Sequence, residues 1–156
     1  MSVAVDANIL LYASDETSPR HVRAREFLAE RATGSEITYF AWSTLFAYLR
    51  VATHPRIFEH PLSPGAAMAN IEALLELPRM RVLSEADGFW DHYRDVTRSI
   101  PVRGNLVPDA NLVALLRQHG VRVLYTNDRD FRKFDAIETR DPFEVREGTD
   151  EWKTNE

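Results

Sequence analysis

The sequence predicts an α/β domain with a mainly parallel β-sheet. Short apolar runs such as Val3–Val5 and Val123–Tyr125 lack polar–apolar alternation, which is typical of strands buried on both faces. Helical segments separate these runs, and a β–α–β–α order favours parallel pairing. Asp6 follows the first run and Asp128 follows the second. In parallel sheets, the functional groups gather at the carboxyl ends of the strands.

Size and composition are consistent with one ordinary domain. The chain has 156 residues, a net charge of −5 and no cysteine, which excludes disulfides and thiolate metal sites. We expect a single domain over residues 1–147 and a polar tail over residues 148–156. The N-terminus does not resemble a signal peptide, and no apolar stretch is long enough to span a bilayer. A cytoplasmic protein without a membrane partner is therefore expected.

Helix and strand signals alternate along the chain. Ser18-Pro19 and Ser63-Pro64 each combine an N-cap residue with proline in the first turn, and Gly120 suits the position just after a helix. Ser43 or Thr44, and Ser84, are candidate caps of two further helices. These signals predict helices at about residues 19–32, 45–53, 64–77, 85–99 and 109–119. The predicted strands are residues 3–5, 36–40, 81–83, 123–125 and 137–139.

Apolar side chains at helical spacing are expected to face the core. In the first helix they are Val22, Phe27 and Leu28. In the helix at residues 85–99 they are Phe89, Trp90, Tyr93 and Val96. The five histidines share no motif with the acidic residues, so we expect packing or surface roles for them.

Three aspartates occupy equivalent places in the predicted fold. Asp6 and Asp128 follow strands, and Asp109 begins an apolar helix. Each of them alone suits a helix cap or a turn, but three at one kind of location are expected to meet at one sheet edge. Clustered like charges need a cation, and hard oxygen ligands suit Mg²⁺ or Mn²⁺. Metal-assisted phosphodiester chemistry is the leading hypothesis. Basic clusters such as the one flanking Asp128 usually form solvated helix faces. Because it borders the proposed site, this cluster is the best candidate to contact phosphate: Arg129, Arg132 and Lys133.

Segments in this order resemble the PIN-domain family. The opening segment Val5–Tyr12, the central segment Pro108–Leu115 and the closing segment Thr126–Phe131 are similar to PIN motifs. Leu49–Phe58 and Arg103–Val107 resemble the branch of VapC toxins. The resemblance implies a three-layer α/β/α sandwich and a Mg²⁺- or Mn²⁺-dependent endoribonuclease that acts as the toxin of a type II toxin–antitoxin pair. It also implies an RNA substrate, a homodimer, and a cognate antitoxin that blocks the site.

The resemblance implies roles for particular residues. The expected catalytic and metal-binding residues are Asp6, Asp109 and Asp128, with Asp130 as a further carboxylate. Many members carry a glutamate where this chain has Ala47. Ser43 or Thr44 is expected to support a metal-bound water instead, and fewer charges favour one ion over two. Asn8 is expected to serve as an ordinary residue at a helix start; the alternatives are that it orients Asp6 or contacts the RNA backbone.

Three other functions remain open on the sequence. A phosphorelay receiver domain needs paired acids after the first strand and a late lysine, whereas Asp6 stands alone and Lys133 is poorly placed. A haloacid-dehalogenase-type phosphatase needs Asp-x-Asp, which Asn8 interrupts. The third alternative is a catalytically weakened PIN-like module that binds RNA or an antitoxin, because Ala47 replaces the usual acid.

Overall fold

The computed structural model describes residues 1–144, so the predicted tail and the end of the domain at residue 147 lie outside the described residues. One five-stranded sheet has the order β3-β2-β1-β4-β5, and each neighbouring pair of strands is parallel. The strands are β1 (Ser2–Val5), β2 (Ile37–Ala41), β3 (Met80–Leu83), β4 (Val123–Tyr125) and β5 (Glu138–Arg140).

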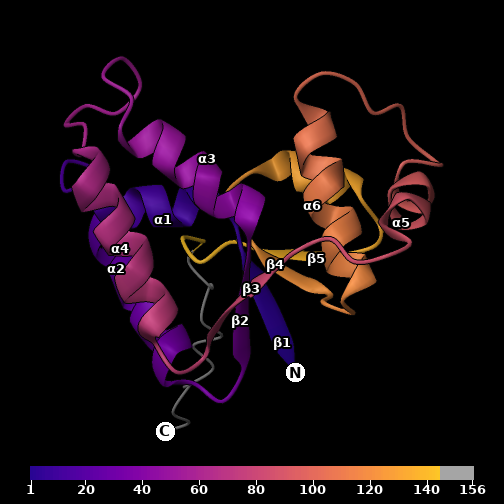
Figure 1. Cartoon of the computed structure of the whole chain (residues 1–156), viewed down its shortest axis with the longest axis horizontal. Helices are drawn as coiled ribbons and strands as arrows, with labels where there is room; N and C mark the ends of the chain where they lie inside the picture. Colours follow the sequence, from indigo (N-terminus) through magenta and orange to yellow (C-terminus); the bar gives the residue numbers. More distant parts are fainter. Residues whose placement is uncertain (145–156) are drawn as a thin grey trace, which may run out of the picture.

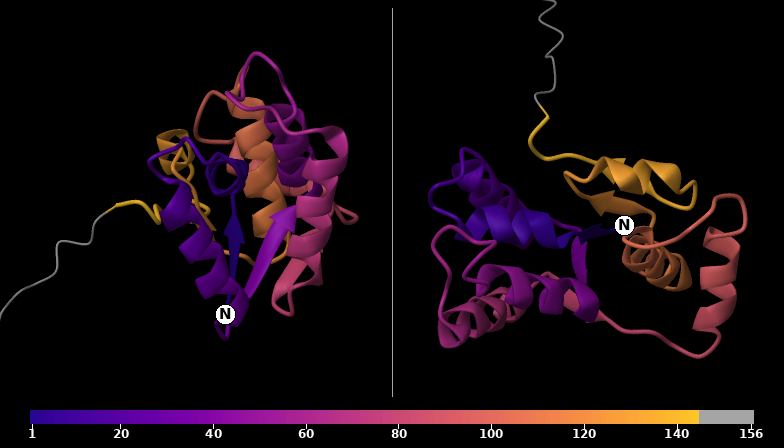
Figure 2. Two further views of the ribbon diagram at one scale, coloured as in Figure 1. Left: turned by 90° about the vertical axis from the view of Figure 1, so that its left-hand side faces the viewer. Right: turned by 90° about the horizontal axis from the view of Figure 1, so that it is seen from above.

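Helices cover both faces of the sheet (Figures 1 and 2). The α-helices are α1 (Ala7–Ser14), α2 (His21–Thr33), α3 (Trp42–Ala52), α4 (Pro64–Glu76), α5 (Phe89–Val96) and α6 (Leu106–Gln118), and the 3-10 helix η1 is Arg129–Lys133. One core cluster joins the sheet to α1–α4, and the other joins it to α5, α6 and η1. This confirms the three-layer α/β/α architecture.

Alternation along the strands assigns neighbouring residues to opposite layers. In β1, Ala4 packs in the α5–α6 core and Val5 in the α1–α4 core. Their partners in β4 follow the same rule, because Ala4 pairs with Leu124 and Val5 with Tyr125. Both faces of the central strands are therefore buried, which explains their continuous apolar sequence.

Several predicted helix boundaries are wrong because local turns replace simple caps. α2 begins at His21 rather than Pro19, since the Ser18 hydroxyl accepts the Arg20 N–H (3.1 Å) and forms a turn before the helix. β2 runs directly into α3, so Ser43 and Thr44 lie inside the first turn and cap nothing. Ser63 does cap α4 as predicted, accepting the Ala66 N–H.

The two helices on the other face also differ from their predicted extents. α6 begins at Leu106, three residues before Asp109, because Pro108 falls in the first turn, where N–H groups have no intrahelical partner. α5 is shorter than predicted, and Ser84 does not cap it. The Gln118 side chain binds the N–H and carbonyl of Ala86 and holds that segment as a loop.

Two predicted core residues are exposed. Val22 is 67% exposed and Trp90 is 65% exposed, whereas Phe27 and Val96 are buried as expected.

Helix α1 was not assigned from the sequence. No helix in residues 1–144 is long and apolar enough to cross a membrane.

A buried tyrosine joins three helices of the α1–α4 layer. The Tyr48 hydroxyl on α3 lies 2.7 Å from the Ser14 hydroxyl on α1 and accepts a hydrogen bond from Asn70 Nδ2 on α4 (3.0 Å). Tyr48 is 1% exposed, so its hydroxyl relies on these two partners instead of on water.

We therefore expect Tyr48→Phe to lower the free energy of unfolding by about 1–2 kcal/mol, because it removes the two hydrogen bonds that the buried Tyr48 hydroxyl makes to Ser14 and Asn70. Urea unfolding measures this change. Tyr93→Phe is the matched control, since the Tyr93 hydroxyl makes no hydrogen bond within residues 1–144. Equal stability of the two variants would contradict the role of the Tyr48 hydroxyl.

Candidate active site

The sheet order brings two acid-bearing segments together. The chain builds β1, β2 and β3 outward in one direction and then returns to place β4 on the other side of β1. This reversal is a topological switch point, where open α/β sheets form their functional crevice. The Asp6 N–H donates to the carbonyl of Tyr125, the last residue of β4 (3.0 Å), and extends the pairing one residue beyond β1. Asp6 and the segment after β4 therefore lie side by side.

Asp6 is held by two hydrogen bonds. Its Oδ1 accepts the Ala7 N–H (2.8 Å), so Asp6 caps α1, and its Oδ2 accepts the Thr126 hydroxyl (2.9 Å). Burial raises the pKa of Asp6, and the Asp128 charge raises it further, while the two hydrogen bonds act in the opposite direction. Capping and membership of an acid cluster therefore coexist at Asp6.

Thr126 connects Asp6 to Asp128, and the sequence alone did not single it out. Its buried hydroxyl donates to Asp6 and also accepts the Asp128 N–H (3.0 Å). Asp128 in turn accepts the Asp130 N–H at Oδ1 (2.9 Å) and caps η1. The sequence feature that could have identified Thr126 as a site residue is its position two residues before Asp128 in the closing motif.

Asp109 completes the group from α6, which lies on the other face of the sheet from α1. It is the fourth residue of α6, and the buried segment Ala110–Leu116 behind it, except for half-buried Asn111, fixes that helix against the sheet. Carboxylate oxygens of Asp109, Asp128 and Asp130 lie within 4.8 Å of one another. Three of the four predicted acids therefore lie within 4.8 Å of one another. The fourth, Asp6, is linked to Asp128 through hydrogen bonds to Thr126.

The charges of this cluster act on Asp109. Burial, followed by the charges of Asp128, Asp6 and Asp130, raises the pKa of Asp109 to about 6, while Lys133 acts in the opposite direction. Lys133 Nζ lies 3.2 Å from Asp130 Oδ1 and offsets part of the negative charge. The Asp109 carboxylate accepts no hydrogen bond from residues 1–144, so its oxygens are available to a ligand.

The predicted supporting residues differ in their surroundings. Asn8 lies in the first turn of α1, and its Oδ1 is buried without a hydrogen-bond partner in the described part of the chain. Ser43 is exposed and Thr44 is buried, and neither forms a hydrogen bond to an acid among the described residues. Ala47 is half-buried on α3, so it is not a fully enclosed core residue.

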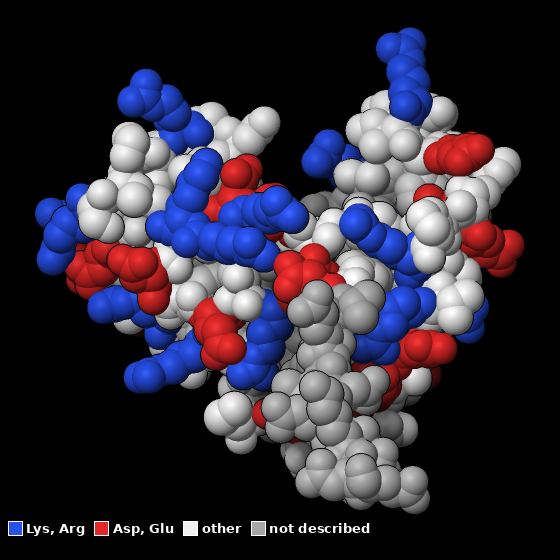
Figure 3. Space-filling model, turned by 180° about the vertical axis from the view of Figure 1, so that it is seen from behind, with Lys and Arg blue, Asp and Glu red and all other residues white. Residues whose placement is uncertain are grey.

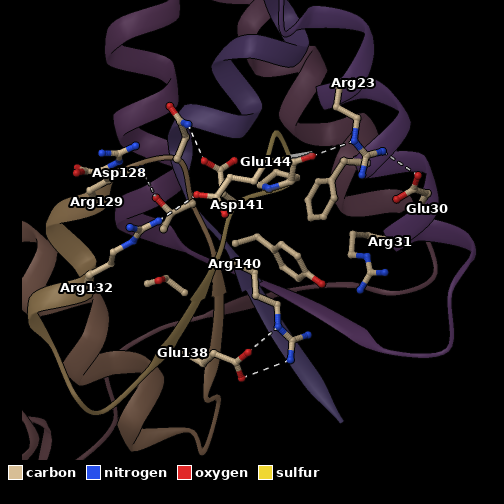
Figure 4. Close-up of a pocket in the computed structure, with 16 residues that line it drawn as sticks. Arg23, Glu30, Arg31, Asp128, Arg129, Arg132, Glu138, Arg140, Asp141 and Glu144 are labelled. Carbon is tan, nitrogen blue, oxygen red and sulfur yellow. Dashed lines mark hydrogen bonds and ion pairs between the residues drawn. The ribbon is translucent and has the colours of Figure 1, made fainter. Parts of the chain in front are cut away.

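A basin of about 860 Å³ adjoins Asp128 between α2, η1 and β5 (Figure 4). Five arginines line it, and most of them already have acidic partners. The ion pairs are Arg23–Glu30 (2.9 Å), Arg31–Glu36 (2.9 Å), Arg132–Glu144 (3.1 Å) and Arg140–Glu138 (3.0 Å). Basic and acidic side chains are similarly interleaved over the back of the molecule (Figure 3). An incoming phosphate would therefore compete with existing partners of Arg132 and Lys133.

Comparison with known proteins identifies the family. The PIN domain family matches residues 3–137. The chain is 44% identical to ribonuclease VapC48 of Mycobacterium tuberculosis over 143 residues, which is 92% of this chain and 99% of that protein. This chain is one of the VapC ribonucleases of the PIN-domain family.

Other VapC proteins extend the comparison. Ribonuclease VapC37 of Mycobacterium tuberculosis is 31% identical over 88% of this chain and 95% of its own length. Among solved structures, VapBC2 from Rickettsia felis, bound to a promoter DNA fragment, matches with a TM-score of 0.64 at 14% identity, over 90% of this chain and 98% of that chain. VapC20 of Mycobacterium tuberculosis, a sarcin–ricin loop cleaving toxin, has a TM-score of 0.62 at 20% identity, over 84% and 93%. At these identities, the structural matches support the VapC fold alone.

The acid cluster predicts an unusual dependence of stability on pH. Because the pKa of Asp109 in the folded protein (about 6) exceeds its ordinary value of 3.8, the folded state binds this proton more tightly than the unfolded state does. This contribution to stability is complete below the ordinary pKa and is lost as the pH rises through about 6. In metal-free buffer, Asp109→Asn should therefore melt at or above the wild-type temperature at neutral pH, with a smaller gain near pH ~4.

Thermal melts in chelator across this pH range measure the effect. Asp135→Asn, at an exposed aspartate outside the cluster, is the control and should run parallel to wild type. Asp109→Asn melting clearly below wild type at neutral pH would argue against strong repulsion at this site.

Proposed function

We propose that this VapC ribonuclease hydrolyses RNA phosphodiester bonds with Mg²⁺ or Mn²⁺ held by Asp6, Asp109 and Asp128, and with Asp130 in a secondary role. The main supporting observation is the convergence of Asp109, Asp128 and Asp130 oxygens within 4.8 Å. Burial and the charges of Asp128, Asp6 and Asp130 together raise the pKa of Asp109, and a bound cation would offset the repulsion between these charges.

The available donors fit a hard divalent cation. All of them are carboxylate oxygens, the ligand type that Mg²⁺ and Mn²⁺ favour, and thiolate ligands are absent because the chain has no cysteine. Asn8 Oδ1 adds a buried oxygen near Asp6 without a hydrogen-bond partner among the described residues. We propose that it accepts a hydrogen bond from a water or a ribose hydroxyl at the site.

The chain's own groups would position the reaction. When bound, the cation would supply an activated water and would offset negative charge developing on the phosphate. Thr126 fixes the Asp6 carboxylate and the Asp128 backbone in one arrangement, which limits reorganisation. The Asp109 carboxylate enters from α6 without hydrogen bonds to residues 1–144 and remains free to bind.

We also propose a cognate antitoxin and a homodimer as partners of this chain, acting in the cytoplasm. An acidic or amphipathic antitoxin segment would cover the acid edge, with an arginine directed at the carboxylates. Similarity to VapBC structures supports the antitoxin. For the homodimer, the support is an exposed aromatic pair on α3, Trp42 (47% exposed) and Phe46 (63% exposed), with ring centroids 6.3 Å apart.

The function is tested by RNA cleavage with purified protein. Cleavage should require added Mg²⁺ or Mn²⁺, and Asp6→Asn should reduce the rate at least about a hundredfold, because it removes charge from the proposed cation site while keeping the side chain's shape. Asp91→Asn, at an exposed residue of α5, is the matched control and should retain activity. Undiminished cleavage in chelator would contradict the proposed metal dependence.

Ala47→Glu distinguishes an active site with few acids from a weakened binding module. If α3 faces the cation, the variant should bind Mn²⁺ more tightly by calorimetry and keep or raise activity, since added ligand charge strengthens hard-cation sites. Ala73→Glu on α4 is the helical control. Unchanged affinity with a large fall in melting temperature would show that Ala47 packs against a neighbour. Mn²⁺ binding by wild type without RNA cleavage would favour the module that binds without cutting.

A further inference from the structure

The side chain between Thr126 and Asp128 is held at both ends. Asn127 Nδ2 donates to Asp141 Oδ2 (2.9 Å). Asn127 Oδ1 accepts from Arg20 Nη1 (2.8 Å) and from the Tyr12 hydroxyl (3.3 Å). Three segments remote in sequence therefore converge on the residue that precedes Asp128.

Arg20 is itself tightly placed. Its guanidinium carbon lies 5.2 Å from the ring centroid of Tyr12 and 5.4 Å from that of Phe143, and these two rings meet edge to face at 5.3 Å. Arg20 Nη1 also donates to the Tyr12 hydroxyl (3.0 Å). Within residues 1–144, Arg20 forms no ion pair. Its positive charge is therefore directed to a neutral amide oxygen and two rings, which is an uncommon use of a half-buried arginine.

The far end of the network is anchored as well. Asp141 Oδ1 accepts the Phe143 N–H (2.8 Å), while Oδ2 holds Asn127. The Thr126 N–H donates to the Arg140 carbonyl (2.9 Å), so the backbone just before Asn127 is tied to the end of β5. Asn127 thus sits on a support that reaches α1, the turn before α2, and the segment after β5.

This support opposes a specific force. Asp128 is exposed and stands in a turn, and the charges of Asp6, Asp109 and Asp130 repel it. Its backbone N–H is held by Thr126, and its Oδ1 accepts the Asp130 N–H within the same turn. The side-chain contacts of Asn127 tie this turn to α1 and to the segment after β5.

We propose that Arg20, Tyr12, Asn127 and Asp141 form a clamp that holds Asp128 in its ligating position, with Arg20 as a positioning residue that acts through Asn127. The proposal rests on the proposed metal-dependent function and extends it to residues that contact neither metal nor RNA. Outer residues that orient metal ligands commonly change metal affinity by about 10–100-fold when mutated.

Two Arg20 variants separate positioning from general stability. Arg20→Met keeps an apolar stem but removes the charge and the donors, whereas Arg20→Lys keeps the charge and a donor. Arg20→Met should weaken Mn²⁺ binding roughly tenfold in calorimetry performed well below the melting temperature, with Arg20→Lys closer to wild type. Arg25→Met, at an exposed arginine of α2, is the matched control and should bind as wild type does.

A polarity swap tests the clamp directly. Asn127→Asp places two carboxylates against each other and should break the contact. Adding Asp141→Asn restores the hydrogen bond between positions 127 and 141 in the reverse direction, because the new amide at position 141 can donate to the new carboxylate at position 127 and still accept the Phe143 N–H. Hydrogen–deuterium exchange of residues 126–133 in metal-free protein should rise in Asn127→Asp and in Arg20→Met, and return toward wild type in the double variant.

Mn²⁺ binding and hydrogen–deuterium exchange test the metal function and the clamp separately. If wild type binds no Mn²⁺, the metal function fails, but exchange still tests the clamp. Unchanged exchange over residues 126–133 in Arg20→Met, or a double variant that exchanges as fast as Asn127→Asp, would overturn the clamp. A lowered melting temperature in Arg20→Met with unchanged Mn²⁺ affinity would also overturn it, since Arg20 would then be a structural residue only.

Discussion

Four aspartates share one edge of the sheet, and the repulsion between their carboxylates is the constraint on which the surrounding structure depends. Burial is the largest cause of the raised pKa values of Asp6 and Asp109, and the charges of neighbouring aspartates raise both pKa values further. A loop of ordinary mobility would relax such a cluster by letting the charges move apart. This chain instead fixes Asp6 at the end of a buried strand, Asp109 on a buried helix, and Asp128 in a turn held by Thr126.

Topology makes that arrangement possible with short connections. β1 and β4 are adjacent and parallel although they lie far apart in the sequence, and their carboxyl ends carry Asp6 and the Thr126–Asp128 turn. The apolar residues that alternate through both layers hold this register, because a slip of one residue would turn Ala4 and Val5 to the wrong faces. The core therefore controls the site's geometry.

Sequence patterns were informative where the responsible interaction is local. Strand positions and the places of Asp6, Asp109 and Asp128 follow from apolar runs and from the residues next to them. The Ser63 cap is local too and was predicted. The start of α5 was missed because the Gln118 side chain, 32 residues away from Ala86, holds the preceding segment as a loop. The exposure of Val22 and Trp90 was missed because helical spacing identifies apolar residues on one face of a helix. It does not show whether another element packs against that face.

The long-range polar contacts lay further out of reach. Thr126 bridges to Asp6 across 120 positions, and Arg20 reaches Asn127 across 107. A motif can mark Thr126 because it stands near Asp128, but nothing near Arg20 in the sequence distinguishes it from the other arginines of the same segment. Only the fold shows that Arg20 lies between two rings and points to the acid-bearing turn.

The absence of a glutamate at Ala47 has a physical consequence for this cluster. A further carboxylate would add repulsion to a group in which the pKa of Asp109 already reaches about 6. Asp130 is an imperfect substitute, because Lys133 lies 3.2 Å from one of its oxygens and the Asp130 N–H occupies Oδ1 of Asp128. A site with fewer free charges gains less attraction for a cation and must rely more on having its ligands already in place. On the proposed function, that dependence accounts for the two sets of contacts that tie the turn carrying Asp128 to the fold, one made by Thr126 and the other by the Arg20 network.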